Sequence, residues 1–445
     1  MFYRLHSEKG VQMLKNAYNK LQHPKLKERR FPETGTTKRN EFHRDFTRIL
    51  YSASFRRLQG KMQILGIQND AFFRNRLTHS LEVSQIARDV ASRIGKVIGK
   101  KAYTNNHDLY VIEAAALAHD IGHPAFGHSG EQALDDICKI DSLGRFEGNA
   151  HNFTILNDIE QKLYNEKGLN LTYRTLFAIN KYLVQEDENV KKFIYKEDYE
   201  LLRPIREETD LIQERTLDVQ IIDIADEIAY AVHDLEDALS LGYFNIDELT
   251  YLLKDAIKDN VRCVNKFKTI VKKAKAIAKT AEVFHTSQEY SQLFRKNLVS
   301  KLTNIFIMDI GLVSITDKAR KVHGTPNVEY ELGFCEWGEL VHALKDIIYN
   351  AVTRHDNIRL YEKRGGIVIK KLYDIYSKKE NYQLLSPDYR ANIDYKSEDP
   401  VSDEDKKKLG RAAVLFIAGM MDNYAKAMYK RYYNIDFDDI PINDN

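Results

Sequence analysis

Apolar side chains recur at intervals of three and four residues along most of this chain, and this periodicity limits the possible folds more than any other feature. Only eight prolines interrupt it in 445 residues. The spacing predicts an all-α, mainly helical fold with minor β elements toward the C-terminal side. It predicts a helix over residues 79–98, a helix in "VIEAAALAHD" that ends right after Asp120, and a third in "TLDVQIIDIADEIAYAVHDLEDALSLG" that ends at Gly242.

Strand signals are confined to two stretches of the C-terminal half. The runs "NVEYELGF", at 327–334, and "GGIVIKKLYDIY", which begins at Gly365, place short β-branched segments after turn residues. They predict a small hairpin on a helical body. The polar, aperiodic stretch 377–408 predicts a long surface loop that leads to a last helix at about residues 404–431.

The charges of the chain nearly balance, with 67 basic and 65 acidic side chains and a net charge of +2. No overall field therefore favours nucleic acid or an anionic membrane as an obligatory partner, and the basic stretch 266–279 is interpreted as a solvated helix face. No uninterrupted apolar stretch has the length of a signal peptide or a membrane-spanning helix. The scattered Cys138, Cys263 and Cys335 are typical of a reducing compartment. We expect a soluble, cytoplasmic protein without a membrane partner.

One run, "LAHDIGHPAFGHSGE" at 117–131, combines three histidines, an aspartate and a glutamate with helix-breaking glycine and proline. His119 and Asp120 offer a neutral nitrogen and an anionic oxygen, which suit Mn, Fe, Ni, Co or Mg better than tetrahedral structural zinc. Two ligands hold an ion too loosely, so others must come from elsewhere, and His79 and Asp226 on the other strong helices are the best candidates. Taken singly, a packed histidine and a salt-bridged surface carboxylate are the simpler explanations of these two residues.

Five blocks follow one another along the chain: "SASFRRLQGKMQ", "RLTHSLEV", "AHDIGHPAFGHSGE", "FEGNAHNF" and "IADEIAYAVHDLED". In this order and at comparable spacing they resemble the signature blocks of HD-domain deoxynucleoside triphosphate triphosphohydrolases, the bacterial dGTPase-like branch. The resemblance covers at least residues 40–240 and is specific, because five ordered blocks are not a coincidence although HD alone is a common dipeptide. It divides the chain into an N-terminal extension (1–38), an HD catalytic core (39–245) and a helical C-terminal region packed on the core (246–445).

The resemblance implies one divalent metal ion per subunit, Mn²⁺, Mg²⁺ or another transition metal. Its implied ligands are His79, His119, Asp120 and Asp226. The resemblance also implies that three residues of the HD block line the reaction centre: His123, His128 and Glu131. Of these, His128, oriented by Glu131, is expected to handle protons, because an imidazole titrates near neutrality.

Six further residues match positions that the family uses near its substrate: Arg57, Gln63, Arg76, Lys181, Tyr230 and Asp234. The cations are expected to bind the triphosphate, Tyr230 and Asp234 to close around the deoxyribose, and Gln63 to contact sugar or base. Two departures stand out. His151 replaces the usual glutamine of "GNAQ" and either alters the pH dependence or, as we favour, hydrogen-bonds as the glutamine would, while Leu183 replaces the proline of a Lys-Tyr-Pro triplet, which weakens the assignment of Lys181.

The implied reaction is hydrolysis of a deoxynucleoside triphosphate, dGTP or several dNTPs, to a deoxynucleoside and inorganic triphosphate, in control of the dNTP pool. A homo-oligomer, often a hexamer, and a regulatory nucleotide or single-stranded DNA are further implied partners. Two alternatives stay open. One is an HD phosphohydrolase of another nucleotide, and the other is a nucleotide-sensing or single-stranded DNA-binding regulator with silent or activated turnover. The phosphate-binding loop G-x-x-x-x-G-K-[ST] is absent.

Overall fold

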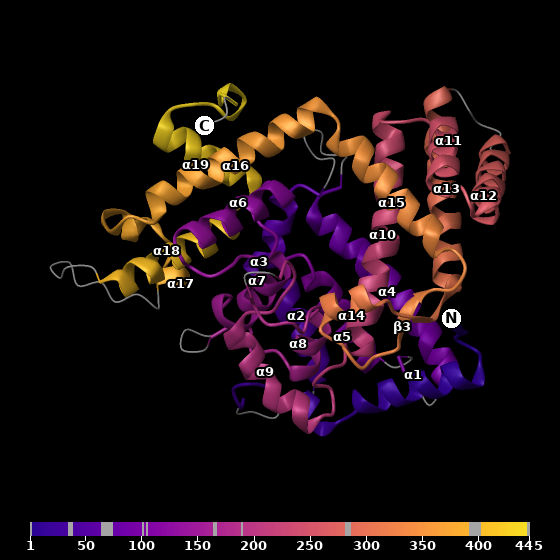
Figure 1. Cartoon of the computed structure of the whole chain (residues 1–445), viewed down its shortest axis with the longest axis horizontal. Helices are drawn as coiled ribbons and strands as arrows, with labels where there is room; N and C mark the ends of the chain where they lie inside the picture. Colours follow the sequence, from indigo (N-terminus) through magenta and orange to yellow (C-terminus); the bar gives the residue numbers. More distant parts are fainter. Residues whose placement is uncertain are drawn as a thin grey trace.

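The computed structural model describes residues 2–33, 39–63, 74–99, 102–103, 106–162, 167–187, 190–280, 286–390 and 402–442. Most of these residues are helical, which confirms the predicted fold class (Figure 1). The elements of the first half are β1 (Phe2–Arg4), α1 (Glu8–Lys20), η1 (Pro24–Lys27), α2 (Glu41–Leu50), α3 (Ala53–Arg57), η2 (Leu58–Gly60), α4 (Arg76–Ile98), α5 (Asn106–Ala118), α6 (Gly127–Ile140), α7 (Gly148–Thr154), η3 (Ile155–Ile159), α8 (Tyr173–Ile179), α9 (Lys196–Glu208) and α10 (Leu217–Leu241). Those of the second half are α11 (Ile246–Ala256), α12 (Val261–Lys279), α13 (Ser287–Asp309), β2 (Ile310–Ser314), α14 (Asp317–His323), β3 (Tyr330–Phe334), α15 (Gly338–Thr353), α16 (Asp356–Tyr376), η4 (Lys379–Leu384), α17 (Pro387–Arg390), α18 (Asp403–Ala418), α19 (Asp422–Tyr433) and η5 (Phe437–Asp439).

Helices α4, α5 and α10 pack against one another in the core. Helix α4 begins three residues before the predicted start, because Asn75 and Thr78 form a reciprocal capping box at its N-terminus. Helix α10 ends as predicted at Gly242, whose φ of 73° lies in the left-handed region that glycine adopts without strain. The apolar stripe that predicted α4 faces the core, although Leu81 on this helix is half exposed.

A three-stranded antiparallel sheet has β2 at its centre, with β1 and β3 on either side. The registers pair Phe2 with Val313 and Tyr330 with Ser314. The predicted strand at 327–334 is confirmed in β3, but its neighbour in the sheet is β2 rather than the run that begins at Gly365.

The prediction of a strand after Gly365 is wrong, because this run lies inside the long helix α16. A Cβ added to Gly365 would lie 2.5 Å from the Cβ of Phe126, so the glycine allows a close helix contact and does not mark a turn. The β-branched Val368 and Ile369 that suggested a strand are fully buried in an apolar cluster that also contains Phe126. Packing at this helix face therefore outweighs the β preference of the individual residues.

The prediction of one long loop over 377–408 is also wrong where the structure describes it. Elements η4 and α17 and the beginning of α18 lie within this range, and residues 391–401 lie outside the described residues. The predicted last helix is two helices, α18 and α19, because Met421 between them has an extended backbone with ψ of 154°.

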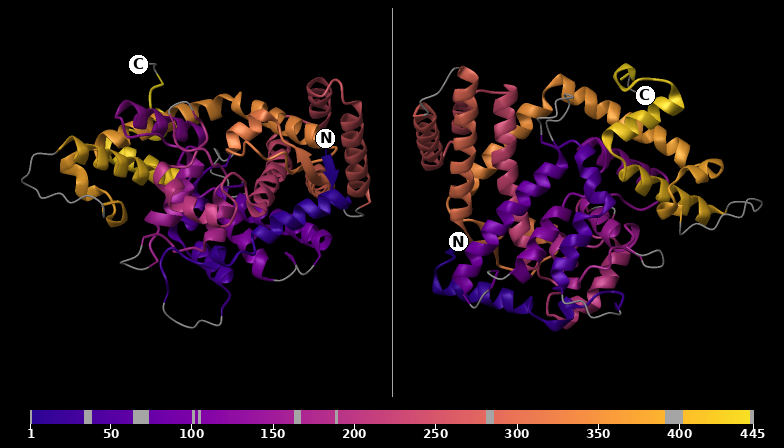
Figure 2. Two further views of the ribbon diagram at one scale, coloured as in Figure 1. Left: turned by 60° about the horizontal axis from the view of Figure 1, so that its bottom comes forward. Right: turned by 180° about the vertical axis from the view of Figure 1, so that it is seen from behind.

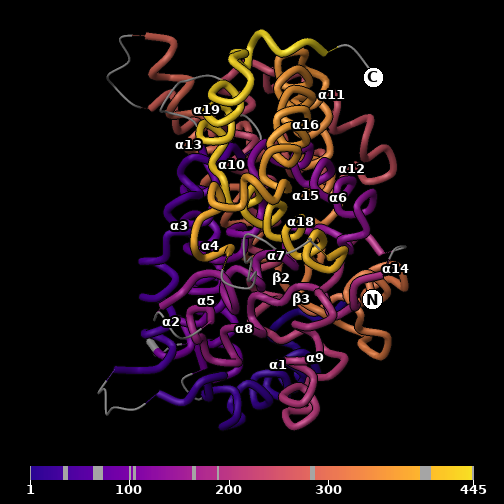
Figure 3. Tube along the Cα trace, turned by 90° about the vertical axis from the view of Figure 1, so that its left-hand side faces the viewer, coloured from indigo at the N-terminus to yellow at the C-terminus, as the bar shows by residue number. Residues whose placement is uncertain are grey.

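The apolar core has two large parts and a small third cluster of Ala150, Phe193 and Tyr195. The larger surrounds α4, α5 and α10 and includes Ile121, while the second surrounds α6, α16 and α18 and includes Ala125. The chain therefore passes from one core to the other within the histidine-rich run. Figures 1 and 2 show α11, α12 and α13 at one end of the molecule and the C-terminal helices toward the other, and Figure 3 shows α16 and α18 beside α6. Among the described residues, no helix is both long and apolar enough to cross a membrane.

Candidate active site

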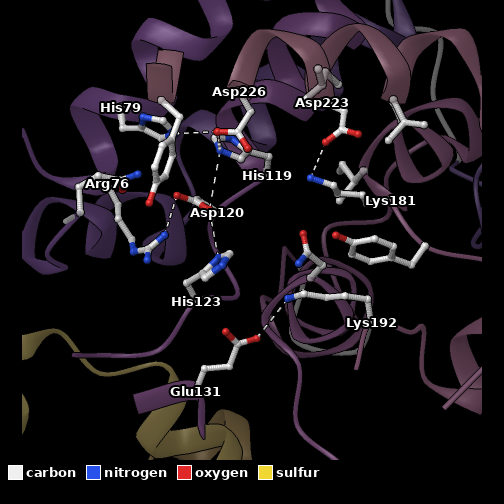
Figure 4. A pocket seen from close by; sticks show the side chains of 18 of the residues that line it. Arg76, His79, His119, Asp120, His123, Glu131, Lys181, Lys192, Asp223 and Asp226 are labelled. Atoms are coloured by element: carbon white, nitrogen blue, oxygen red, sulfur yellow. Dashed lines mark hydrogen bonds and ion pairs between the residues drawn. The ribbon is translucent and has the colours of Figure 1, made fainter. Parts of the chain in front are cut away.

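A cavity of about 290 Å³ brings together most of the predicted site residues (Figure 4). Its walls come from α4, from the turn after α5, from α6 and from α10. The predicted residues that line it are His79, His119, Asp120, Asp226, His123, His128, Glu131, Gln63, Arg76, Lys181 and Tyr230. Arg57 and Asp234 are not part of this lining.

Three predicted metal ligands form one compact group. The ligand atoms of His79, His119 and Asp226 all lie within 4.8 Å of one another. The Nε2 atom of His79 is 3.0 Å and that of His119 is 3.6 Å from Oδ1 of Asp226. Two imidazoles and a carboxylate are a donor set that suits a divalent transition metal or Mg²⁺.

The position of His119 supports this interpretation. Its Nδ1 lies 2.7 Å from the carbonyl oxygen of Ala116, which orients the ring, while the buried Nε2 has no hydrogen-bond partner among the described residues. Burial lowers the pKa of His119, but Asp120 and Asp226 outweigh burial and raise the pKa to about 9. The local field therefore favours a cation at this position, and the residues fit a bound metal ion.

The HD pair lies in a turn, since α5 ends at Ala118, one residue before His119, and not after Asp120 as predicted. This turn directs the Asp120 carboxylate toward two other side chains. Its Oδ2 accepts a hydrogen bond from Nη1 of Arg76 at 2.7 Å, and its Oδ1 lies 3.0 Å from Nδ1 of His123. Asp120 thus lies beside the three-residue group, with Oδ1 3.7 Å from Nε2 of His119.

His128 and Glu131 form a pair on the opposite wall, on the first turns of α6. Nδ1 of His128 is 3.5 Å from Oε2 of Glu131, and the imidazole is largely exposed. Contact with Glu131 raises the pKa of His128 above its ordinary value. Burial would raise the pKa of Glu131, but His128, Lys192 and the amide of Gly148 outweigh burial and lower it. The glutamate therefore remains ionised and favours the protonated imidazole.

Cations surround the space between these two walls. Arg76 is buried against Asp120, and Lys181 forms an ion pair with Asp223. Lys192, which no sequence pattern indicated, forms an ion pair with Glu147 and lies 3.7 Å from Glu131.

Four polar residues also line the cavity and were not predicted from the sequence: Asn149, Tyr182, Lys192 and Asp223. Asn149 lies inside the block "FEGNAHNF", and Tyr182 directly follows Lys181. Asp223 lies one turn before Asp226 on α10, so helical spacing could have indicated it. Lys192 lies in an irregular segment before α9 and has no such signal.

Tyr230 and Gln63 face the cavity, whereas two other predicted substrate residues do not. Asp234 is buried one turn beyond Tyr230, where burial raises its pKa to about 7, and its Oδ2 has no partner among the described residues. Arg57 donates to the carbonyl oxygens of Ala53 and Gly419, both at 3.4 Å.

His151, the histidine in "GNAH", is fully buried. Neither of its ring nitrogens has a hydrogen-bond partner within the described part of the chain, so the hydrogen bond expected in place of glutamine is not found there. Burial lowers the pKa of His151 well below its ordinary value, and the ring stays neutral.

Comparison with known proteins gives two family matches and a set of relatives. Residues 76–231 match the HD domain and residues 336–431 match the phosphohydrolase-associated domain. The deoxyguanosinetriphosphate triphosphohydrolase-like protein 2 of Vibrio cholerae is 41% identical over 401 residues, which cover 89% of each chain. Deoxyguanosinetriphosphate triphosphohydrolase-like proteins of Shewanella loihica and Shewanella halifaxensis are 30% and 29% identical and cover 89% of this chain and 93% and 92% of their own.

Proposed function

We propose that this chain, which belongs to the HD-domain family of deoxyguanosinetriphosphate triphosphohydrolase-like proteins, hydrolyses deoxynucleoside triphosphates to a deoxynucleoside and inorganic triphosphate. One observation carries the proposal. The group of His79, His119 and Asp226 and the pair of His128 and Glu131 face the same cavity. A metal-binding group opposite a protonated imidazole is suited to phosphate ester hydrolysis.

The cations of the cavity are suited to a triphosphate, which carries about four negative charges. Arg76, Lys181 and Lys192 all line the cavity, and each is already oriented by a carboxylate. Lys192 is our addition to the residues expected from the sequence. Tyr230 lies on the same wall as Asp226 and offers a ring face for the sugar.

In the proposed reaction the oxygen of a water forms a bond to the α-phosphorus and the water gives up a proton to solvent, while the bond from this phosphorus to the 5′-oxygen of the nucleoside breaks. A divalent ion at His79, His119, Asp120 and Asp226 would supply positive charge that polarises the phosphate oxygens. His128 donates its proton to the departing 5′-oxygen, and Glu131 keeps His128 protonated beforehand. Arg76 holds the α-phosphate side of the substrate next to Asp120.

A product assay tests the proposal. Purified protein with Mn²⁺ is given each of the four dNTPs singly and then mixed, and the products are resolved by anion-exchange chromatography. Triphosphate plus deoxynucleoside is the expected outcome. Orthophosphate or pyrophosphate with a nucleotide product would overturn the reaction, and absence of any product in all mixtures would favour another HD substrate or a nucleotide sensor.

The variant His128→Ala tests the proton donor. We expect it to retain metal and to lose at least about 100-fold in kcat, the range typical of a general acid. The matched control is His107→Ala, because His107 is exposed on α5 and does not line the cavity. Turnover like that of the wild type in His128→Ala would remove this residue from the mechanism.

The variant Asp226→Ala tests the ligand group. Removing the shared carboxylate is expected to abolish stoichiometric Mn²⁺ binding, measured by elemental analysis after gel filtration. The control is Asp223→Ala, one turn earlier on the same helix, which should retain metal because Asp223 pairs with Lys181 and Arg215. Full occupancy in Asp226→Ala would contradict the ligand assignment.

We extend the proposal, on the resemblance alone, to a homo-oligomer and to activation by a second nucleotide or by single-stranded DNA. Light scattering after size exclusion measures the assembly, and turnover that appears only in mixed dNTPs would indicate activation. A monomer that turns over each dNTP singly would contradict both parts.

A further inference from the structure

The C-terminal helices contact the reaction centre through the segment that precedes His128. Helix α6, which carries His128 and Glu131, packs against α16 and α18 (Figure 3). Phe126, immediately before α6, has a φ of 61°, in the left-handed region that L side chains rarely adopt. Its ring stacks on Phe437 and contacts the edge of Tyr361. The conformation that starts α6 is therefore held by residues of the C-terminal region.

A single buried carboxylate joins three segments at this place. Asp422, the first residue of α19, is only 5% exposed. Its Oδ1 accepts a hydrogen bond from the amide of Phe126 at 3.2 Å. Its Oδ2 accepts from the amide of Met62 at 3.1 Å and from the hydroxyl of Tyr361 at 2.9 Å. Met62 directly precedes the cavity residue Gln63, so Asp422 is bonded to the backbone beside both Gln63 and α6.

Lys61 makes a second connection between the C-terminal helices and the segments around Met62 and Phe126. We call this place the junction. Its buried Nζ donates to the carbonyl oxygens of His123 and Ala418. Its own carbonyl oxygen accepts from the amide of Arg76 at 3.2 Å. Lys61 thus ties the end of α18 to His123 and Arg76, both of which line the cavity.

We propose that Asp422 and Lys61 are positioning residues, through which the C-terminal helices fix the distance between the Gln63 segment and the His123–His128 segment. This inference rests on the function proposed above. Neither side chain lines the cavity, so neither is expected to touch the substrate. The carboxylate is required because it accepts hydrogen bonds on both oxygens, whereas an asparagine would turn an NH₂ group toward one of three donors.

The experiment compares Asp422→Asn with Asp403→Asn. Both aspartates are the first residue of a C-terminal helix, but the Asp403 side chain is 91% exposed, so this control reproduces the loss of charge at a helix start without the junction. The measurements are metal content, kcat, KM and the hydrogen–deuterium exchange of two peptides, which cover residues 58–63 and 119–128. We expect Asp422→Asn to retain metal and KM within about threefold, to lose about 10- to 100-fold in kcat, and to exchange faster in these two peptides only. Asp403→Asn should match the wild type.

Two results would overturn the proposal. One is unchanged exchange and kcat in Asp422→Asn, and the other is a loss of activity that only follows a loss of metal. If Asp422→Asn does not fold, Lys61→Met decides. It keeps an unbranched side chain, one atom shorter than lysine, while removing both hydrogen bonds of Nζ, and the same pattern of kcat and exchange is expected. If the wild type has no triphosphohydrolase activity, the proposed function fails, and the exchange data alone decide whether the junction holds the two segments.

Discussion

Two adjacent glycines in α16, Gly365 and Gly366, should differ in stability when each is replaced by alanine. A Cβ on Gly365 would lie 2.5 Å from both Cβ and Cγ of Phe126, about 1 Å closer than an ordinary carbon–carbon contact. Phe126 cannot readily move away, because its ring is held by Tyr361 and Phe437. A Cβ on Gly366 would meet only the Oγ of Ser129 at 3.5 Å, an ordinary contact.

The magnitudes follow from this geometry. Replacing glycine by alanine inside a helix stabilises it by about 1 kcal/mol at either position. Overpacking against Phe126 costs roughly 1–3 kcal/mol and applies only to Gly365. Gly366→Ala should therefore be about 1 kcal/mol more stable than the wild type, and Gly365→Ala should be roughly 1–3 kcal/mol less stable than Gly366→Ala, because the helix preference cancels in this comparison.

Urea unfolding followed by far-ultraviolet circular dichroism measures both variants against the wild type. The difference between their free energies of unfolding is the quantity to compare. If Gly365→Ala were as stable as Gly366→Ala, the close contact with Phe126 would not exist in solution, and the reasoning that assigns Gly365 to helix packing would be refuted.

Three further predictions concern buried or paired charges. Glu131→Gln removes the contact that raises the pKa of His128, so the alkaline limb of the kcat–pH profile should move to lower pH, and an unmoved limb would argue against this pairing. Burial raises the pKa of Asp198 to about 7, so the folded carboxyl binds a proton that the unfolded chain has released above about pH 4, and stability falls as pH rises toward 7. Asp198→Asn should remove this loss of stability, which is at most about 4 kcal/mol in the free energy of unfolding. Parallel stability profiles of the variant and the wild type from pH 4 to 8 would contradict this prediction. Arg174→Met leaves two buried aspartates without their cation and should cost about 3–5 kcal/mol in urea unfolding, against little change for a surface arginine.

Structure could be predicted from the sequence where interactions within one or two helical turns determine it. The glycine at 242 and the apolar spacing before it predicted the end of α10, because both act within one or two helical turns. The motif residues converge as expected because they occupy the N-terminal part of α4, the turn after α5 and the middle of α10, three elements that pack together. The resemblance of the five ordered blocks, and not spacing alone, identified these residues.

Predictions from the sequence failed where contacts between distant segments determine the local structure. Val368 and Ile369 have a β preference, but their burial beside α6 places them in a helix, and nothing local indicates that contact. Lys192 reaches the cavity from an irregular segment and pairs there with Glu147, and no periodicity marks this position. Arg57 donates to the carbonyl of Gly419, in a region that the resemblance did not cover, and its role at the substrate stays a prediction.

The pairing of β1 with β2 has a consequence for synthesis of the chain. Phe2 is translated about 300 residues before its partner Val313. At a synthesis rate of about 5–20 residues per second, the N-terminal strand waits at least about 15 seconds on the ribosome with its hydrogen-bonding groups unpaired. Helices α4 and α5, which are neighbours in sequence and pack against each other, both emerge during this interval. Nascent chains arrested before residue 310 should therefore protect α4 and α5 from protease while leaving Phe2–Arg4 accessible, with the strand becoming protected only after β2 has left the exit tunnel.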